Sequence, residues 1–211
     1  MRLPQLLQSP DDPRAVAALC RYYGTHGYSD SFTGARFDSW DSTGSRSADR
    51  DRFTADDLVA VTFLSVNVPA QAAILLLDSK ADRFSELLTD LGDDRDLVGE
   101  KAPLDIGGAG SAVWTELMSL PGVGPTTASK LLARKRPRLR PIYDSVVAEV
   151  VGSTRLWEPL RMLLTSEPAL HDRLLHLRGE AGLSDDVSAL RVFDVVAWME
   201  GKYGLAQFGQ A

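Results

Sequence analysis

The sequence predicts an all-α fold, and two kinds of signal support this prediction. Apolar residues recur at helical spacing through most of the chain. Helix start and stop signals bracket several of these segments; Asp12-Pro13 and Gly24, for example, delimit a helix over residues 13–23. With 211 residues, the chain is long enough for one domain or for two small helical lobes.

Residues 24–53 lack a helical pattern and are rich in Gly, Ser, Asp and Arg. Within them, the stretch Ser31–Trp40 predicts a short β-hairpin near residues 28–40, with Gly34 close to its turn. Five aromatic side chains are scattered through this region, and either base stacking or anchoring to the core would explain them; we favour anchoring. They are Tyr28, Phe32, Phe37, Trp40 and Phe53.

Three helices are expected between residues 54 and 91. Thr54 is the candidate N-cap of the first, with Asp57 as its capping-box partner. This first helix is apolar on most sides, which predicts that it is buried. The second helix spans residues 69–77, and the third is capped by Ser79.

A helix, a glycine turn and a second helix are predicted over residues 112–135. In the turn, Gly122 and Gly124 permit a positive φ or a close backbone approach, and Pro125 suits the first position of the second helix. The backbone amides at the start of that helix, together with the positive end of its dipole, form a seat for a phosphate group.

The charges near this turn differ from those of the whole chain, whose net charge is −6. From Leu117 to Tyr143 there are six cations and no acid, which leaves 17 cations against 29 acids in the rest of the sequence. A basic island on an acidic protein is expected of a local contact with nucleic acid, although a solvated helix end would explain it equally well. The six cations are Lys130, Arg134, Lys135, Arg136, Arg138 and Arg140.

Four further helices are predicted after position 144. In the last of them, Arg191 and Asp194 lie one turn apart within a largely apolar stretch. A structural ion pair is favoured there over a second functional carboxylate. The four helices cover residues 146–151, 157–164, 168–177 and 187–203.

Two neighbouring segments carry a family resemblance. Leu120–Ala128 (LPGVGPTTA) and Arg140–Val146, which contains Asp144, resemble the hairpin and the catalytic-aspartate segment of the helix-hairpin-helix (HhH-GPD) DNA glycosylases. Outside these segments only the order of the helices is similar. The resemblance implies a two-lobed helical glycosylase-like fold. In that fold, residues 54–152 form the lobe with the hairpin, and residues 1–53 plus 153–211 form the second lobe.

The resemblance implies an activity, monofunctional hydrolysis of the N-glycosidic bond of a damaged or modified base. Asp144 aligns with the catalytic aspartate, whose carboxylate stabilises the positive charge that builds on the deoxyribose as the base leaves. Bifunctional members carry a nucleophilic lysine where this chain has Thr126, so we expect no Schiff base and no strand cleavage. The histidine common after the aspartate is replaced by Val146, while Ser145 keeps a hydroxyl.

For Asp144 a second role is open at this stage. The residue precedes a predicted helix, so its carboxylate would accept hydrogen bonds from the first backbone amides as an N-cap. Catalysis and capping are compatible, because one carboxylate has two oxygen atoms.

The resemblance also implies contacts with double-stranded DNA. The hairpin and the cations after it would contact phosphate. Asn67, which ends a segment similar to the family's Leu-Ser-x-Gln, would fill the gap left by a flipped base. For Asn67 the favoured alternative is a helix-terminal residue in the left-handed conformation. The expected DNA-binding residues are Gly122, Val123, Gly124, Thr126, Thr127, Lys130, Arg134, Lys135, Arg136 and Asn67.

No catalytic cofactor is expected. Some members of the family carry a four-cysteine iron–sulfur cluster, which this sequence excludes because Cys20 is its one cysteine. The resemblance implies a monovalent cation, Na⁺ or K⁺, on the carbonyls of residues 120–124, and no other metal site is expected. We further expect a cytoplasmic monomer without a membrane-spanning segment.

Two other functions stay open from the sequence. The chain could have kept the fold and lost the base pocket, which would make it a non-catalytic helix-hairpin-helix DNA-binding protein. Alternatively, the hairpin packs against another protein and the chain is an interaction module. Fold alone does not separate these functions from the enzyme.

Overall fold

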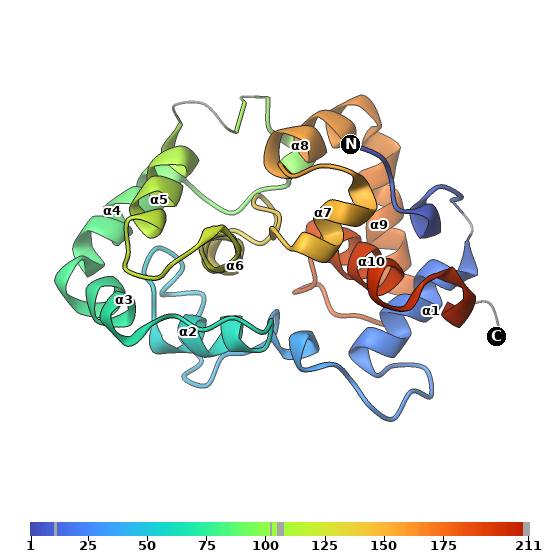
Figure 1. Ribbon diagram of the computed structural model, residues 1–211, viewed down its shortest axis with the longest axis horizontal. Coiled ribbons are helices and arrows are strands. Elements are labelled where there is room, and N and C mark those ends of the chain that lie inside the picture. The colour runs from blue at the N-terminus through green and yellow to red at the C-terminus, as the bar shows by residue number, and fades with distance from the viewer. Residues whose placement is uncertain (11, 102, 105–107, 209–211) are drawn as a thin grey trace.

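A computed structural model describes residues 1–10, 12–101, 103–104 and 108–208 of the chain. The predicted all-α fold is confirmed, since the described residues form ten α-helices and no β-strand (Figure 1). None of these helices is long and apolar enough to cross a membrane. The helices are α1 (Pro13–Tyr23), α2 (Ala55–Thr62), α3 (Ala70–Ile74), α4 (Ala81–Leu91), α5 (Ala109–Met118), α6 (Pro125–Lys135), α7 (Ser145–Val151), α8 (Trp157–Ser166), α9 (Pro168–Glu180) and α10 (Ala189–Tyr203).

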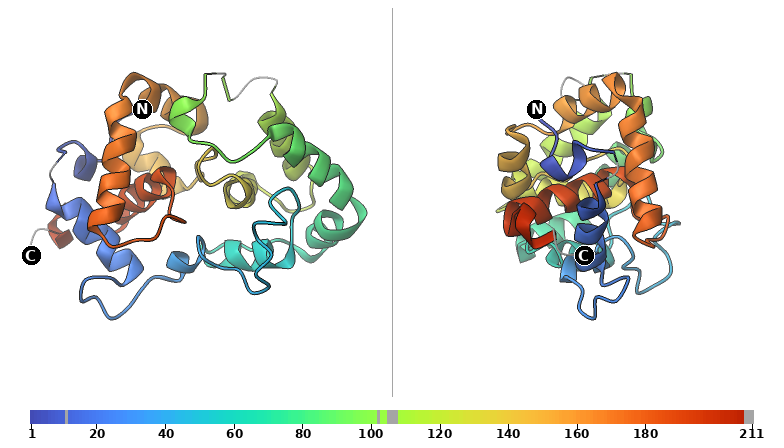
Figure 2. Two further views of the ribbon diagram at one scale, coloured as in Figure 1. Left: turned by 180° about the vertical axis from the view of Figure 1, so that it is seen from behind. Right: turned by 90° about the vertical axis from the view of Figure 1, so that its right-hand side faces the viewer.

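Two helices, α6 and α10, organise the packing (Figures 1 and 2). Helix α6 packs against α2 and α5, whereas α10 packs against α1, α7 and α9. The lobe boundary predicted at residue 152 would separate α7 from α10. These two helices pack closely, however, because Gly201 has no side chain: a Cβ there would lie 2.5 Å from Val146 Cγ1.

Local capping signals determine several helix ends as predicted. Asp12 Oδ1 accepts a hydrogen bond from the Arg14 amide at 3.0 Å, and Gly24 ends α1 in the left-handed conformation. The capping box of Thr54 and Asp57 is present at the start of α2. These ends are local interactions, which is why the sequence predicts them.

The β-hairpin expected near residues 28–40 is wrong. The described chain forms a 3₁₀ turn at Thr33–Arg36 instead. Phe32 stacks on Tyr22 with ring centroids 5.3 Å apart, and the Gly34 carbonyl accepts from Arg191 Nη2 at 2.9 Å. In place of strand pairing, the segment packs a ring against Tyr22 and accepts a hydrogen bond from the buried Arg191. Anchoring, the favoured role of the aromatic residues, holds for Phe37 and Phe53, whereas Tyr28 is 43% exposed.

Helix boundaries between α2 and α4 also differ from expectation. Helix α2 ends at Thr62, and Val59 on it is 39% exposed, so the helix is not buried on all sides. Helix α3 continues into a π-helical turn over Leu75–Ser79, which takes in the residue predicted to be a cap. Lys80 is the N-cap of α4 in place of Ser79.

Candidate active site

Asp144 is the N-cap of α7, and its side chain also reaches a cavity. Oδ1 accepts a hydrogen bond from the Val146 amide at 2.9 Å. Oδ2 lies 3.6 Å from Lys130 Nζ, and about a fifth of the side chain is exposed. One oxygen therefore fixes the orientation of the carboxylate, and the residue lines a cavity together with Lys130.

That cavity, which we call the aspartate pocket, has a volume of about 310 Å³. This is at the small end of the range for ligand pockets and suits a single planar ring system. Its walls come from α1, α6, α10, the segment before α7 and the chain on either side of α2. Aromatic walls are provided by Tyr22, Phe32, Phe63 and Trp198, and charged groups by Lys130, Asp144, Arg191, Asp194 and Lys202.

Lys130 does not lie where the phosphate prediction put it. Its side chain is 4% exposed, and Nζ donates to the Leu64 carbonyl at 2.8 Å beside Asp144. Burial lowers the pKa of the Lys130 ammonium, and the charge of Asp144 opposes that shift. The signal for this position was present in the sequence, because Lys130 follows Thr126 by four residues and so shares its face of α6.

The predicted ion pair between Arg191 and Asp194 is confirmed. Arg191 Nε also donates to Asp38 Oδ2 at 3.0 Å, and Nη2 donates to the Tyr22 hydroxyl at 2.9 Å. Burial raises the pKa of Asp194 to about 6; Arg191 opposes this shift, and Asp144 adds to it. Asp194 therefore has a structural partner and also lines the same pocket as Asp144.

The glycine turn is open to solvent. Pro121, Gly122 and Pro125 are exposed, and Gly122 has a φ of +72°. Val123 is buried, and its amide donates to the Leu120 carbonyl at 3.1 Å. Gly124 is the N-cap of α6 and supplies no side-chain acceptor to the first amides of that helix.

The turn also fits the monovalent cation that the resemblance implies. The Leu120 carbonyl accepts from the Val123 amide, and the Gly124 carbonyl accepts from the Ala128 amide at 2.9 Å. Each oxygen keeps a second lone pair for a cation. The backbone donor set of the turn is therefore compatible with Na⁺ or K⁺.

The expectation that Arg134, Lys135 and Arg136 contact DNA is wrong, because all three are buried, at 3%, 5% and 1% exposed. Arg134 Nη1 donates to the Phe37 carbonyl at 2.6 Å. Lys135 Nζ donates to the Asp49 carbonyl at 3.0 Å and pairs with Asp57 at 2.5 Å. Arg136 donates to the carbonyls of Leu88, Arg50 and Gly92.

The physical reason lies in the segment 37–52, which runs beside α2 and α6 without regular secondary structure (Figure 2). Its carbonyl groups have no helical or strand donors, so the cations of α6 supply the hydrogen bonds that buried carbonyls require. Burial lowers the pKa of Arg134 and of Lys135, and Asp57 opposes the shift in both. Arg134, Lys135 and Arg136 thus stabilise segment 37–52 from inside the protein.

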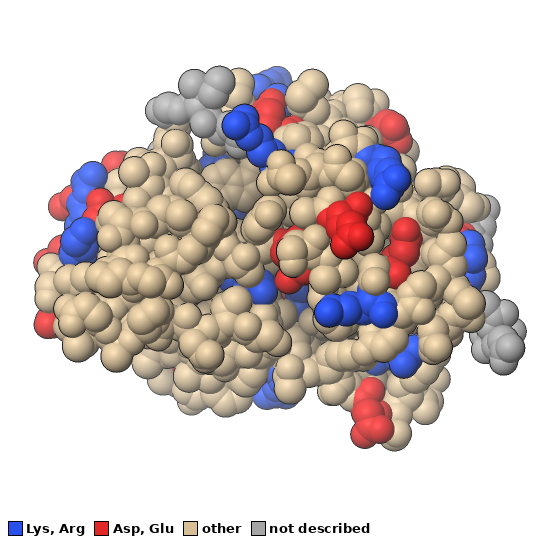
Figure 3. Space-filling view, viewed as in Figure 1, with Lys and Arg blue, Asp and Glu red and all other residues tan. Residues whose placement is uncertain are grey.

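Two other expected DNA contacts lie away from the aspartate pocket. Asn67 is exposed, but the pocket is lined by Leu64 and Ser65, and Ser65 has the left-handed backbone (φ +61°) considered for Asn67. Thr127 is 8% exposed, so its side chain faces inward. The surface over α3, α5 and the turn carries almost no charged side chain in Figure 3.

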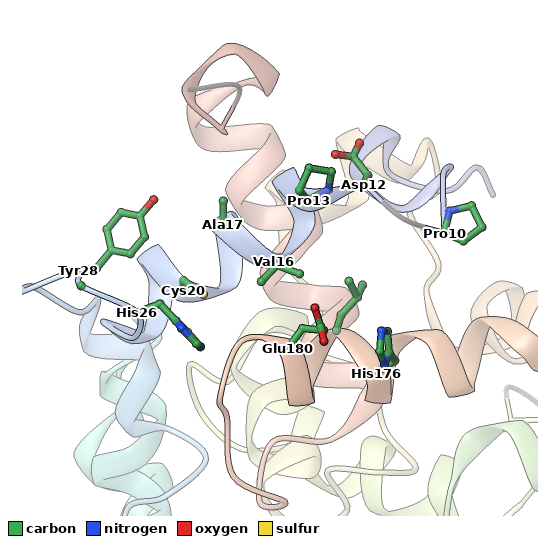
Figure 4. Close-up of a pocket in the computed structure, with 12 residues that line it drawn as sticks. Pro10, Asp12, Pro13, Val16, Ala17, Cys20, His26, Tyr28, His176 and Glu180 are labelled. Atoms are coloured by element: carbon green, nitrogen blue, oxygen red, sulfur yellow. The ribbon is translucent and has the colours of Figure 1, made fainter. Parts of the chain in front are cut away.

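A second cavity, of about 650 Å³, lies between α1 and α9. His26, His176 and Glu180 line it, together with Val16 and Cys20 of α1 (Figure 4). None of the catalytic or DNA-binding residues expected from the sequence lines this cavity. Among the described residues, no group of His, Cys, Asp or Glu side chains is arranged to hold a metal ion.

The comparisons with known proteins give a family and no function. The chain matches, over residues 15–201, a family described as "Family of unknown function (DUF6308)". Neither a curated protein nor a solved structure matches the chain.

Proposed function

The chain belongs to a family of unknown function, and from its site we propose that it is a DNA N-glycosylase, which hydrolyses the bond between a damaged or modified base and deoxyribose. One observation carries the proposal: a carboxylate fixed at a helix start, Asp144, opens on an aromatic-walled pocket of base size. Helix α6 connects the solvent-exposed glycine turn to the segment that carries Asp144.

In the proposed reaction, the target base leaves the DNA stack and enters the aspartate pocket. Phe32 and Trp198 offer ring surfaces to it, and both are held by edge contacts with neighbouring rings. As the C–N bond breaks, Asp144 Oδ2 stabilises the charge on the sugar and orients the attacking water. Its other oxygen, bonded to the Val146 amide, keeps the carboxylate in place without reorganisation.

DNA would be held mainly through the backbone of the turn. The amides that begin α6 and the dipole of this helix favour a phosphate. A monovalent cation, where bound, would be held by carbonyl groups of residues 120–124 and would supply positive charge near that phosphate. Because the cations Arg134, Lys135 and Arg136 are occupied internally, few side-chain contacts with phosphate are expected, and the salt dependence of binding should be shallow.

The test is a base-release assay. Duplexes that carry a panel of lesions are incubated with the protein and then cleaved with hot alkali at any abasic site. We expect cleavage with at least one lesion, its loss in Asp144→Asn, and retained DNA binding. Glu149→Gln, an exposed carboxylate on α7, is the matched control and should cleave normally. DNA binding without cleavage on a broad panel would favour the non-catalytic DNA-binding protein.

A second candidate, a protein-interaction module, is favoured by the uncharged surface over α3, α5 and the turn (Figure 3). A surface that contacts DNA is ordinarily rich in Lys and Arg. Pull-down with duplex DNA across a salt series separates the two candidates. Complete absence of binding at low salt would reject the glycosylase and support the interaction module.

A further inference from the structure

We propose that this protein has a second binding site, for a nucleobase that carries a phosphate, in the cavity between α5 and α8. This cavity has a volume of about 460 Å³ and is distinct from the aspartate pocket. The site does not depend on the proposed glycosylase activity. We call it the tryptophan pocket; its lining includes Trp114, Trp157, Tyr143, Pro125 and Arg155.

Three aromatic rings from separate elements line the tryptophan pocket. Trp114 comes from α5, Trp157 begins α8, and Tyr143 lies in the segment before α7. The two tryptophan rings meet edge to face with centroids 4.9 Å apart. Planar rings are favourable surfaces for a nucleobase, since every base has a π-face to stack.

The rings are fixed in position by polar contacts behind them. Trp157 Nε1 donates to the Pro141 carbonyl at 3.2 Å, and the Arg140 guanidinium lies 4.9 Å from the Trp157 ring centroid. Arg140 fits there because α5 has Gly110 beside it: a Cβ on Gly110 would lie 1.7 Å from Arg140 Nη2. Preorganised rings lose little conformational freedom when a ligand binds.

Tyr143 is held in place through its backbone. Its amide donates a hydrogen bond to Ser129 Oγ of α6 at 2.9 Å. The neighbouring residues Ile142 and Asp144 line the aspartate pocket, whereas Tyr143 lines the tryptophan pocket. This alternation is that of an extended chain, in which successive side chains point to opposite sides. One short segment therefore separates the two pockets.

The charges of the tryptophan pocket favour a phosphate. Arg155 is exposed at its wall and forms no ion pair with a described residue, and no Asp or Glu is among the described residues of the lining. Glu158, next to Trp157 on α8, is bonded to Arg161 and to the Leu104 amide. Pro125 of the wall is the first residue of α6, so the positive end of that helix dipole faces the same cavity.

The experiment is a titration of tryptophan fluorescence in the full chain. Deoxyadenosine monophosphate is the probe, and deoxyadenosine and N-acetylphenylalaninamide, which does not fluoresce under tryptophan excitation, are the comparison ligands. We expect saturable quenching by the monophosphate and weaker binding of the nucleoside. A short single-stranded oligodeoxyadenylate distinguishes the sources of the ligand: tighter binding than the monophosphate indicates a strand, and equal binding indicates a free nucleotide.

Variants assign the binding to this pocket. Trp114→Leu should weaken the affinity about tenfold or more, the effect of losing one stacking surface. Arg155→Gln should remove the difference between monophosphate and nucleoside. Trp40→Leu, which lines neither pocket, is the matched control and should leave the affinity unchanged, whereas Trp198→Leu tests the aspartate pocket for the same ligand. Circular dichroism melting of each variant confirms that it is folded.

Four results would overturn the proposal. Three of them are an absence of quenching at millimolar monophosphate, an unchanged affinity in folded Trp114→Leu, and binding of N-acetylphenylalaninamide as tight as that of the nucleotide. Loss of binding in Trp198→Leu alone would assign the ligand to the aspartate pocket and reject this site. None of these outcomes depends on base release, so they are distinct from a failure of the proposed enzymatic activity.

Discussion

Lys130 Nζ lies 3.6 Å from Asp144 Oδ2, in a side-chain pair that joins the middle of α6 to the start of α7. The Lys130 ammonium also donates to the Leu64 carbonyl, so the same amine connects the chain just after α2 to this pair. Three segments far apart in the sequence thus meet at one buried cation. The wall of the aspartate pocket depends on this meeting point.

The two roles of Asp144 are separable by substitution. Asparagine caps helices about as well as aspartate, whereas alanine loses the bond to the Val146 amide. Both variants lose the charge that faces Lys130, and we expect Asp144→Ala to lower the free energy of unfolding by about 1 kcal/mol more than Asp144→Asn, because alanine also loses the cap. Urea unfolding measures both, and an equally large loss in the asparagine variant would contradict the capping role.

Monofunctional hydrolysis predicts that borohydride traps no covalent complex with DNA. The Lys130 amine is held by the Leu64 carbonyl and by Asp144, and Thr126 occupies the family's lysine position. Gel electrophoresis after borohydride treatment of an enzyme–lesion mixture checks this. A trapped complex that disappears in Lys130→Met would mean that an imine forms and that the proposed mechanism is incomplete.

The buried cations of α6 should matter for stability rather than for DNA binding. Arg134→Met removes one of the two cations that pair with the buried Asp57 carboxylate, together with the donor to the Phe37 carbonyl, which should cost about 3–5 kcal/mol. Arg138→Met removes an exposed pair with Asp96 and should cost about 0–1 kcal/mol. Denaturant unfolding compares the two variants; equal losses would contradict the internal role of Arg134.

Asp194 should give the protein a component of stability that grows as pH falls. Its pKa is raised from the ordinary value of 3.8 to about 6 in the fold, so between these values the native state binds the proton first. Stability from this group therefore rises as pH falls from about 6 to 4, by an amount on the order of 2 kcal/mol. The groups that shape this titration are Arg191, Lys130 and Asp144.

The measurement is a difference between the protein and Asp194→Asn. The free energy of unfolding is measured for both proteins over that pH range. The comparison is needed because carboxylates such as Asp96 and Glu158 have lowered pKa values, so their contribution to stability decreases as pH falls. Subtraction isolates Asp194. A difference that does not vary with pH would reject the prediction.

Gly34 should tolerate no side chain. A Cβ there would lie 1.9 Å from the Tyr22 hydroxyl oxygen and 2.9 Å from Leu64 Cδ2, in the wall of the aspartate pocket. We expect Gly34→Ala to destabilise the fold by about 1–3 kcal/mol through overpacking. Gly99→Ala, where no atom lies within 4 Å of the added Cβ, is the control in the same thermal unfolding measurement and should be close to neutral.

The sequence predicted the features that depend on neighbouring residues. Both ends of α1 and the capping box of α2 follow from residues within a few positions. The pair of Arg191 and Asp194 follows from one helical turn. The exceptions have local causes too: the π-helical turn at Leu75–Ser79 shifts the cap of α4 by one residue.

The sequence did not predict which way the cations of α6 point. Composition gives six positive charges near the turn, but it does not show that segment 37–52 presents backbone carbonyls to Arg134 and Lys135. The β-hairpin was wrong for the same reason, since Phe32 and Gly34 find their partners on α1 and α10. In both cases the partners are remote in the chain, and charge or β-propensity alone carries no information about them.

The sequence by itself determined the helices, the exposed glycine turn and the place of Asp144 at a helix start, because each arises from interactions over a few residues. Only the tertiary structure decided that Lys130, Asp144 and Asp194 share one pocket and that every cation of the basic island except Arg138 is buried. The physical reason is burial: whether a charged side chain meets solvent, a carbonyl or another charge depends on the segments packed over it, which come from distant parts of the chain.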